Sequence, residues 1–204
     1  MRHVAPLVLA WLAACGSVEL PREHFWRLDL PAPAGGELPR GGVLRVDDLQ
    51  LGNALSGDCL VRADGPNHLE QLELQRWIAP LDRLITEAVV LGLSRTRIFT
   101  LVKGAGDAGA EDHVLHGRVV EFGELTQGDT DVGRAVIQFW IEGKDGIALA
   151  EEIQAEVPLE GQGPEAAVRA LSHALQQVLD ELVGRMRAAG LLTGAIDAAP
   201  VSGK

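Results

Sequence analysis

The chain has 204 residues, enough for one domain with short tails, and it is 47% hydrophobic and 23% charged, as folded globular proteins are. Its formal net charge at pH 7 is −11. This acidity argues against nucleic acid as a partner, and against a membrane surface that holds the chain by charge alone.

The N-terminus has the pattern of a cleavable signal peptide. A short basic start, residues 1–3, precedes an uncharged apolar stretch over residues 4–14, about half the length that a transmembrane helix needs. The stretch ends in Leu12-Ala13-Ala14-Cys15, which is similar to a lipobox. We therefore predict cleavage before Cys15 and attachment of lipid to its thiol, with several acyl chains giving stable anchoring. The alternative is a plain secretory signal in which Cys15 is incidental.

Gly16 indicates where the lipoprotein is sorted, and Cys59 is the remaining cysteine. In lipoproteins of double-membrane bacteria, which the segment resembles, an Asp after the lipidated cysteine retains the protein in the inner membrane. Gly16 therefore indicates sorting to the periplasmic face of the outer membrane. With Cys15 lipidated, Cys59 has no partner within the chain, and it could be a buried thiol, an intermolecular disulfide or a reactive group. We expect it to be buried or inert.

The first half of the remaining chain predicts strands followed by a helix. Four short runs have the pattern of strands: 25–30, 43–51, 60–63 and 68–72, the last two as a hairpin. The Pro- and Gly-rich residues 31–42 predict a loop. From Trp77 onward apolar residues recur with a period near 3.6, which predicts a helix with Pro80 in its first turn and Gly92 near its end.

The second half predicts four strands and a long helix. The strand-like runs are 96–103, 113–123, 132–142 and 147–157. The turn Lys144-Asp145-Gly146 predicts that the last two pair as a hairpin. An amphipathic helix is expected from Pro164 to about Gly190.

These elements favour an α+β fold in which two helices pack on one face of a mostly antiparallel sheet. We divide the chain into a signal peptide (1–14), a lipidated tether (15–24), a single domain (25–192) and a disordered tail (193–204).

With these features the chain resembles the ABC-type transport auxiliary lipoprotein family, whose best-known branch is paraquat-inducible protein C. The matching residues are the lipobox ending at Cys15, the strand Phe25-Trp26-Arg27-Leu28, and the segment Arg76-Trp77-Ile78-Ala79-Pro80-Leu81. The resemblance covers most of residues 12–190.

The resemblance implies a non-enzymatic role in moving lipids or other hydrophobic molecules between the inner and outer membranes. The implied partners are an ABC permease with its ATPase and a mammalian-cell-entry domain protein, and a homo-oligomeric ring is compatible with the family. The alternative is an envelope structural or assembly lipoprotein without a transporter partner.

The polar residues predict no catalytic site, metal site or cofactor. His113 and His116 have a spacing similar to that of metal ligands, but a strand places residues three apart on opposite faces. Pairs of neighbouring acids such as Asp47 and Asp48 point apart for the same reason. We expect Trp77 to be a core residue, with contact to a partner as the alternative.

Overall fold

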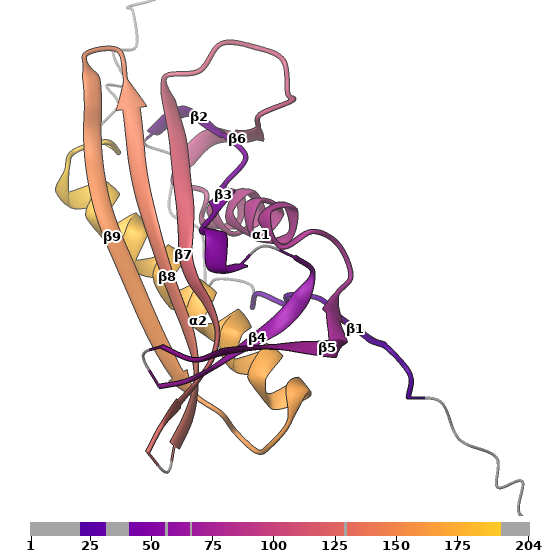
Figure 1. Cartoon of the computed structure of the whole chain (residues 1–204). Coiled ribbons are helices and arrows are strands. Elements are labelled where there is room, and N and C mark those ends of the chain that lie inside the picture. Colours follow the sequence, from indigo (N-terminus) through magenta and orange to yellow (C-terminus); the bar gives the residue numbers. More distant parts are fainter. Residues whose placement is uncertain (1–20, 32–40, 56, 66, 129, 193–204) are drawn as a thin grey trace, which may run out of the picture.

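The computed structural model describes residues 21–31, 41–55, 57–65, 67–128 and 130–192 (Figure 1). The predicted signal peptide and lipobox, Cys15, Gly16, most of the tether and the predicted tail lie outside these residues.

Nine strands, two α-helices and one short 3₁₀ helix make up the described part of the chain. The strands are β1 (His24–Trp26), β2 (Gly41–Val46), β3 (Gln50–Leu51), β4 (Cys59–Asp64), β5 (Leu69–Trp77), β6 (Phe99–Gly104), β7 (His113–Gln127), β8 (Thr130–Gly143) and β9 (Gly146–Pro158). The helices are η2 (Asn53–Leu55), α1 (Leu81–Thr96) and α2 (Pro164–Ala188).

All nine strands belong to one curled sheet organised around β7. On one edge β7 pairs with β2, β3 and β4 in turn, all parallel to it, and on the other edge it pairs with β8, which is antiparallel. The pairs β1–β5 and β2–β6 are also parallel, whereas β4–β5 and β8–β9 are antiparallel hairpins.

The expectation of a mostly antiparallel sheet was therefore wrong, because five of the eight strand pairs are parallel. Apolar alternation shows that a strand has one buried face, but it does not show which strand lies beside it or in which direction. Here β2, β3 and β4 follow one another along the same edge of β7. Their pairing partners advance from Leu115 through Val119 to Thr126.

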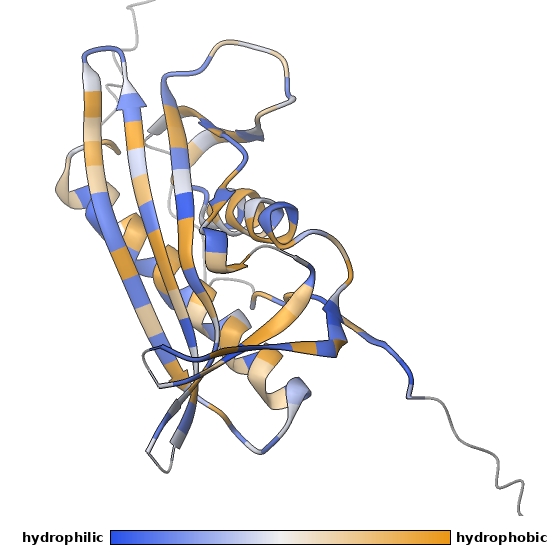
Figure 2. Ribbon diagram, viewed as in Figure 1, coloured by the Kyte–Doolittle hydropathy of each residue, from blue (hydrophilic) through white to orange (hydrophobic). Residues whose placement is uncertain are grey.

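The two helices and the sheet share one hydrophobic core. The helix α2 packs along β8 and β9, while α1 packs against β6 and touches α2 (Figure 1). Apolar and polar residues alternate along β7, β8 and β9 (Figure 2), and the fully buried side chains of α2 include Leu171 and Leu175. Gly133 lets β8 approach α2 closely, since a Cβ there would lie 2.7 Å from the backbone of Ala170.

Several predicted boundaries shift. The expected strand 25–30 is reduced to β1, and the expected strand 43–51 is divided into β2 and β3 around Leu49, which is buried in the core. The Leu49 amide donates to Thr86 Oγ1 on α1 at 3.0 Å, so it is not available to a neighbouring strand. Gly41 and Gly42, predicted to be loop, begin β2.

The first helix begins at Leu81, four residues later than predicted. Trp77 is the last residue of β5, and Pro80 precedes the helix as its N-cap. The helix ends at Thr96, followed by Arg97 in the left-handed conformation (φ 57°), so β6 begins only at Phe99. The β4–β5 and β8–β9 hairpins and the long C-terminal helix are confirmed.

Candidate functional site

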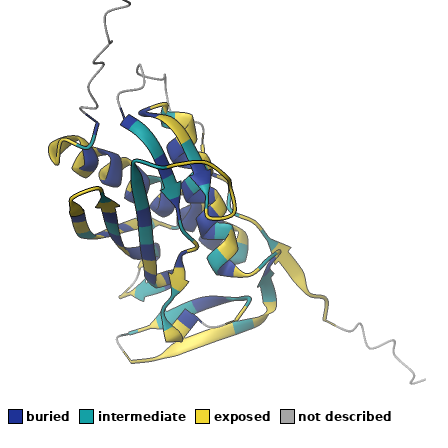
Figure 3. Cartoon of the chain, turned by 90° about the horizontal axis from the view of Figure 1, so that it is seen from above, coloured by how far each residue is buried: buried dark blue, intermediate teal, exposed yellow. Residues whose placement is uncertain are grey.

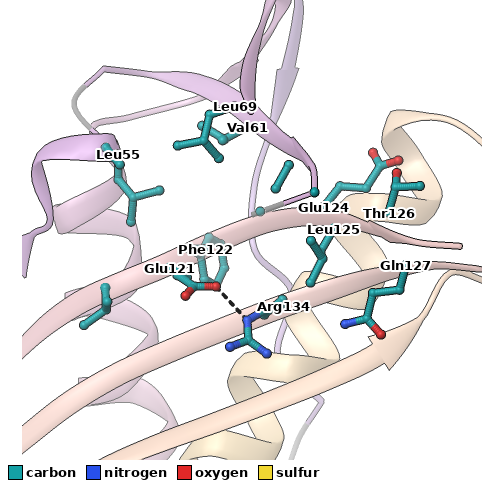
Figure 4. Close-up of a pocket in the computed structure, with 15 residues that line it drawn as sticks. Leu55, Val61, Leu69, Glu121, Phe122, Glu124, Leu125, Thr126, Gln127 and Arg134 are labelled. Atoms are coloured by element: carbon teal, nitrogen blue, oxygen red, sulfur yellow. Dashed lines mark hydrogen bonds and ion pairs between the residues drawn. The ribbon is translucent and has the colours of Figure 1, made fainter. Parts of the chain in front are cut away.

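A cleft of about 620 Å³ lies between the β4–β5 hairpin, η2 and the C-terminal half of β7 (Figure 4). Most of its wall is apolar. The side chains that carry this character are Leu55, Val61, Ala63, Leu69, Phe122 and Leu125. Such walls suit an apolar ligand or an apolar side chain of a partner.

The cleft exists because the β4–β5 hairpin crosses the long strand β7 instead of continuing the sheet as a flat surface (Figure 1). Arg62 on β4 pairs with Glu124 on β7, and Val61 lies so close that a Cβ at Gly123 would be 2.6 Å from its carbonyl oxygen. Phe122 is 2% exposed and its ring packs against Trp77, so the floor of the cleft is continuous with the core.

The charged groups at the cleft are paired with one another. Arg62 donates two hydrogen bonds to Glu124, from Nε at 3.0 Å and from Nη2 at 3.2 Å, and this bonding raises the pKa of Arg62 above its ordinary value. Arg134 donates to Glu121 at 2.6 Å (Figure 4) and also pairs with Glu156. Each arginine compensates the charge of the carboxylate that it binds, so the cleft presents apolar walls and not a charged binding site.

The two histidines predicted to lie on opposite faces have separate surroundings. His116 lies between Asp47, 3.1 Å from Nδ1, and Glu142, 3.6 Å from Nε2, and its ring stacks on Trp140 with centroids 5.5 Å apart. His113 packs near Gly143. Within the described residues there is no group of three or more His, Cys, Asp and Glu side chains placed to hold a metal ion.

Trp77 is placed in the core, the first of the two roles predicted for it. Its side chain is 2% exposed, and its ring centroid lies 5.9 Å from that of Phe122, with the planes at 48°. Its amide donates to the Asp58 carbonyl at 2.6 Å. The ring therefore offers no accessible surface to a partner while the chain is folded.

Cys59 is half-buried at the start of β4. Burial raises the pKa of its thiol above the ordinary value, while the neighbouring Arg76 acts in the opposite direction. The thiol is therefore protonated at neutral pH, which makes it a poor nucleophile.

Among the described helices, neither α1 nor α2 is both long enough and apolar enough to span a bilayer.

A family model described as "ABC-type transport auxiliary lipoprotein component" matches residues 26–183, from the last residue of β1 into the final turns of α2. This chain belongs to that family. The resemblance predicted from Cys15, Phe25–Leu28 and Arg76–Leu81 is therefore confirmed at the level of the family. The family is one of transport auxiliary lipoproteins and not of enzymes.

Solved structures agree with the fold of this auxiliary lipoprotein. A Xanthomonas campestris protein of family DUF330 has a TM-score of 0.72 at 16% identity, with 82% of this chain and 96% of that chain covered. A hypothetical protein from Chlamydia trachomatis has a TM-score of 0.54 at 12% identity, covering 76% of this chain and 99% of that one. At such identities the likeness concerns the fold alone. No curated protein matches the sequence.

The cleft was not predicted from the sequence. Its walls come from β4, β5, η2, β7 and β8, and the ion pair that supports it joins residues 62 positions apart. The predicted strand ended four residues before β7 does, so it left out Glu124 and Leu125, which line the cleft.

Proposed function

We propose that this auxiliary lipoprotein is anchored by lipid on Cys15 to the periplasmic face of the outer membrane. There it serves an ABC transport system that moves lipids or other hydrophobic molecules between the two membranes. Its partners are a mammalian-cell-entry domain protein and the ABC permease with its ATPase. The observation that carries the proposal is the match of the family model over residues 26–183.

Two further features support a hydrophobic cargo and a membrane location. The cleft beside β7 has apolar walls, and the charges near it are neutralised in pairs. The Leu12–Cys15 lipobox and Gly16 are the sequence signals for lipidation and for export to the outer membrane. A lipid anchor would hold the domain at that membrane, although its acidic charge disfavours electrostatic attachment to anionic lipid.

The first experiment is affinity capture of the tagged, full-length protein from detergent-solubilised membranes, with mass spectrometry of the co-purifying proteins. We expect a mammalian-cell-entry protein and an ABC permease, and we expect Cys15→Ser to reduce their recovery. Capture of unrelated envelope proteins, with no transporter subunit, would contradict the proposal and favour a structural lipoprotein.

A matched pair of variants tests the role of the cleft. Leu69 lines the cleft and is 54% exposed, whereas Leu101 on β6 is 52% exposed and does not line it. Leu69→Asp should lower the amount of lipid that co-purifies with the protein, as measured by mass spectrometry of an organic extract, and Leu101→Asp should not. Equal lipid content in the two variants would remove the cleft from the proposed function.

A further inference from the structure

Exposed apolar side chains concentrate at the edge of the sheet where the described chain begins. Seven large hydrophobic residues of the described chain are exposed, and four of them belong to β1, to β5 or to the residue after β5. These four are Phe25, Leu69, Leu74 and Ile78. Figure 3 shows β1 and much of β5 in the colour of exposed residues.

Phe25 and Ile78 lie on one face of the β1–β5 pair. The two strands are parallel and Phe25 lies opposite Arg76, so Phe25 points to the same side as Arg76. Ile78 is two residues beyond Arg76, and its amide donates to the Trp26 carbonyl at 2.8 Å, which continues the ladder. Trp77, which lies between Arg76 and Ile78 in sequence, points to the core and is 2% exposed. Phe25 and Ile78 are 56% and 60% exposed.

This pair of side chains, here called the Phe25–Ile78 patch, carries little unpaired charge. Arg76 lies on the same face, but its guanidinium pairs with Asp58 at 2.7 Å and with Glu23 at 3.0 Å. The cation is therefore neutralised within the chain. The patch presents the ring of Phe25 and the methyl groups of Ile78 beside a network in which two carboxylates share one cation.

The position of the patch relative to the anchor decides what can cover it. Pro21 is the first described residue, and it lies six residues after Cys15. Six residues span at most about 20 Å when fully extended. A chain lipidated on Cys15 must therefore hold Pro21 within about 20 Å of the lipid headgroups, and β1 begins three residues later.

We propose that the Phe25–Ile78 patch is a membrane-contact surface, which inserts into the interface of the leaflet that carries the Cys15 lipid and so orients the domain on it. The proposal rests on the lipidation of Cys15 in the proposed function. The short distance to the anchor selects the lipid surface as occupant, because a tether of this length keeps the patch beside the leaflet. The contact is apolar, so it does not depend on attraction between charges.

The test uses the full, lipidated protein reconstituted into phosphatidylethanolamine/phosphatidylglycerol vesicles whose acyl chains are brominated. Phe25→Trp and Ile78→Trp place a fluorescent ring in the patch, and bromine quenches only rings that reach the leaflet. Ile147→Trp is the matched control, because Ile147 is 69% exposed but is the second residue of β9, beside the turn that lies far from β1 (Figure 1). The parent protein, which keeps Trp26, Trp77 and Trp140 after cleavage, supplies the background.

We expect about a twofold or larger quenching of the added fluorescence for the two patch variants, little quenching for Ile147→Trp, and no change in 0.5 M salt, because screening weakens only charge attraction. Equal quenching at the patch and at Ile147, or none at the patch, would overturn the proposal. Cross-linking of an unquenched patch to a second copy or another protein would assign it to a protein interface instead. Intact mass spectrometry of the same sample reports the lipid on Cys15. A sample without lipid would overturn the anchor and the patch together, whereas a lipidated sample with an unquenched patch would overturn the patch alone.

Discussion

Lys103 and Glu111 form an ion pair, 3.0 Å from Nζ to Oε2, although the side chain of Lys103 is only 4% exposed. Lys103 also donates to the Gly109 carbonyl, so its ammonium ties the loop after β6 to the end of that strand. Arg45 on β2 approaches the other oxygen of Glu111 at 3.2 Å. This network holds the loop that leads into β7 in one position.

The network predicts a loss of stability in acid. The bond from Lys103 is the largest of the effects that lower the pKa of Glu111. Because the folded-state pKa is lowered, the stabilisation is complete above the ordinary Glu pKa of about 4.3 and is lost as pH falls below it. Glu111→Gln should lower the free energy of unfolding at pH 7, and the difference from the parent protein should shrink below pH 4 in urea titrations. Glu160→Gln, in the exposed turn before α2, is the control, and a difference independent of pH would contradict the prediction.

The Arg62–Glu124 pair at the cleft predicts that removal of the arginine destabilises the fold. The Glu124 side chain is 6% exposed, so Arg62→Ala leaves a buried carboxylate without its bidentate partner. We expect a loss of about 1–3 kcal/mol in the free energy of unfolding. Arg134→Ala breaks ion pairs to partly exposed acids and should cost less than about 1 kcal/mol. Urea denaturation of both variants measures these losses. Equal losses in the free energy of unfolding would show that burial of Glu124 does not add to the cost of removing its partner.

Trp77 and Ile78 are neighbours in sequence with opposite surroundings. Trp77→Ala empties a core position beside Phe122 and should destabilise the fold by about 3–5 kcal/mol. Ile78→Ala should change stability by less than about 0.5 kcal/mol, since its side chain is 60% exposed. The measurement is thermal or urea unfolding followed by circular dichroism. A small effect at Trp77 would contradict the core role that the structure assigns to it.

Two glycines predict effects of opposite sign. Gly133→Ala would place a Cβ 2.7 Å from backbone atoms of Ala170 and Leu171, so β8 and α2 must separate and stability should fall by about 1–3 kcal/mol. Gly184 is a solvent-exposed residue within α2, and a Cβ added there would have nothing within 4 Å. Gly184→Ala should therefore raise stability by about 0.5–1 kcal/mol. Melting temperatures that move in the same direction for both variants would show that the helix–strand approach is not the deciding contact.

The sequence alone determined the existence and type of most elements, because each depends on local periodicity. The alternation in residues 132–142 and 147–157 and the turn at Lys144–Gly146 predicted the β8–β9 hairpin, and the apolar stripe after Pro164 predicted α2. The family also followed from short local motifs, and the match over residues 26–183 confirmed it. Lipidation of Cys15 and sorting through Gly16 stay predictions, because they lie outside the described residues.

Only the tertiary structure decided the direction and neighbours of the strands, the position of Trp77 and the cleft. Trp77 fits a helical pattern with the residues after it, yet it pairs in β5 because its ring is buried against Phe122, 45 positions along the chain. Likewise β2, β3 and β4 line one edge of β7 in parallel, an arrangement that their own apolar patterns do not specify. Local patterns record which face of an element is buried. The choice of what covers that face depends on packing between distant segments, and that choice formed both the cleft and the exposed β1–β5 edge.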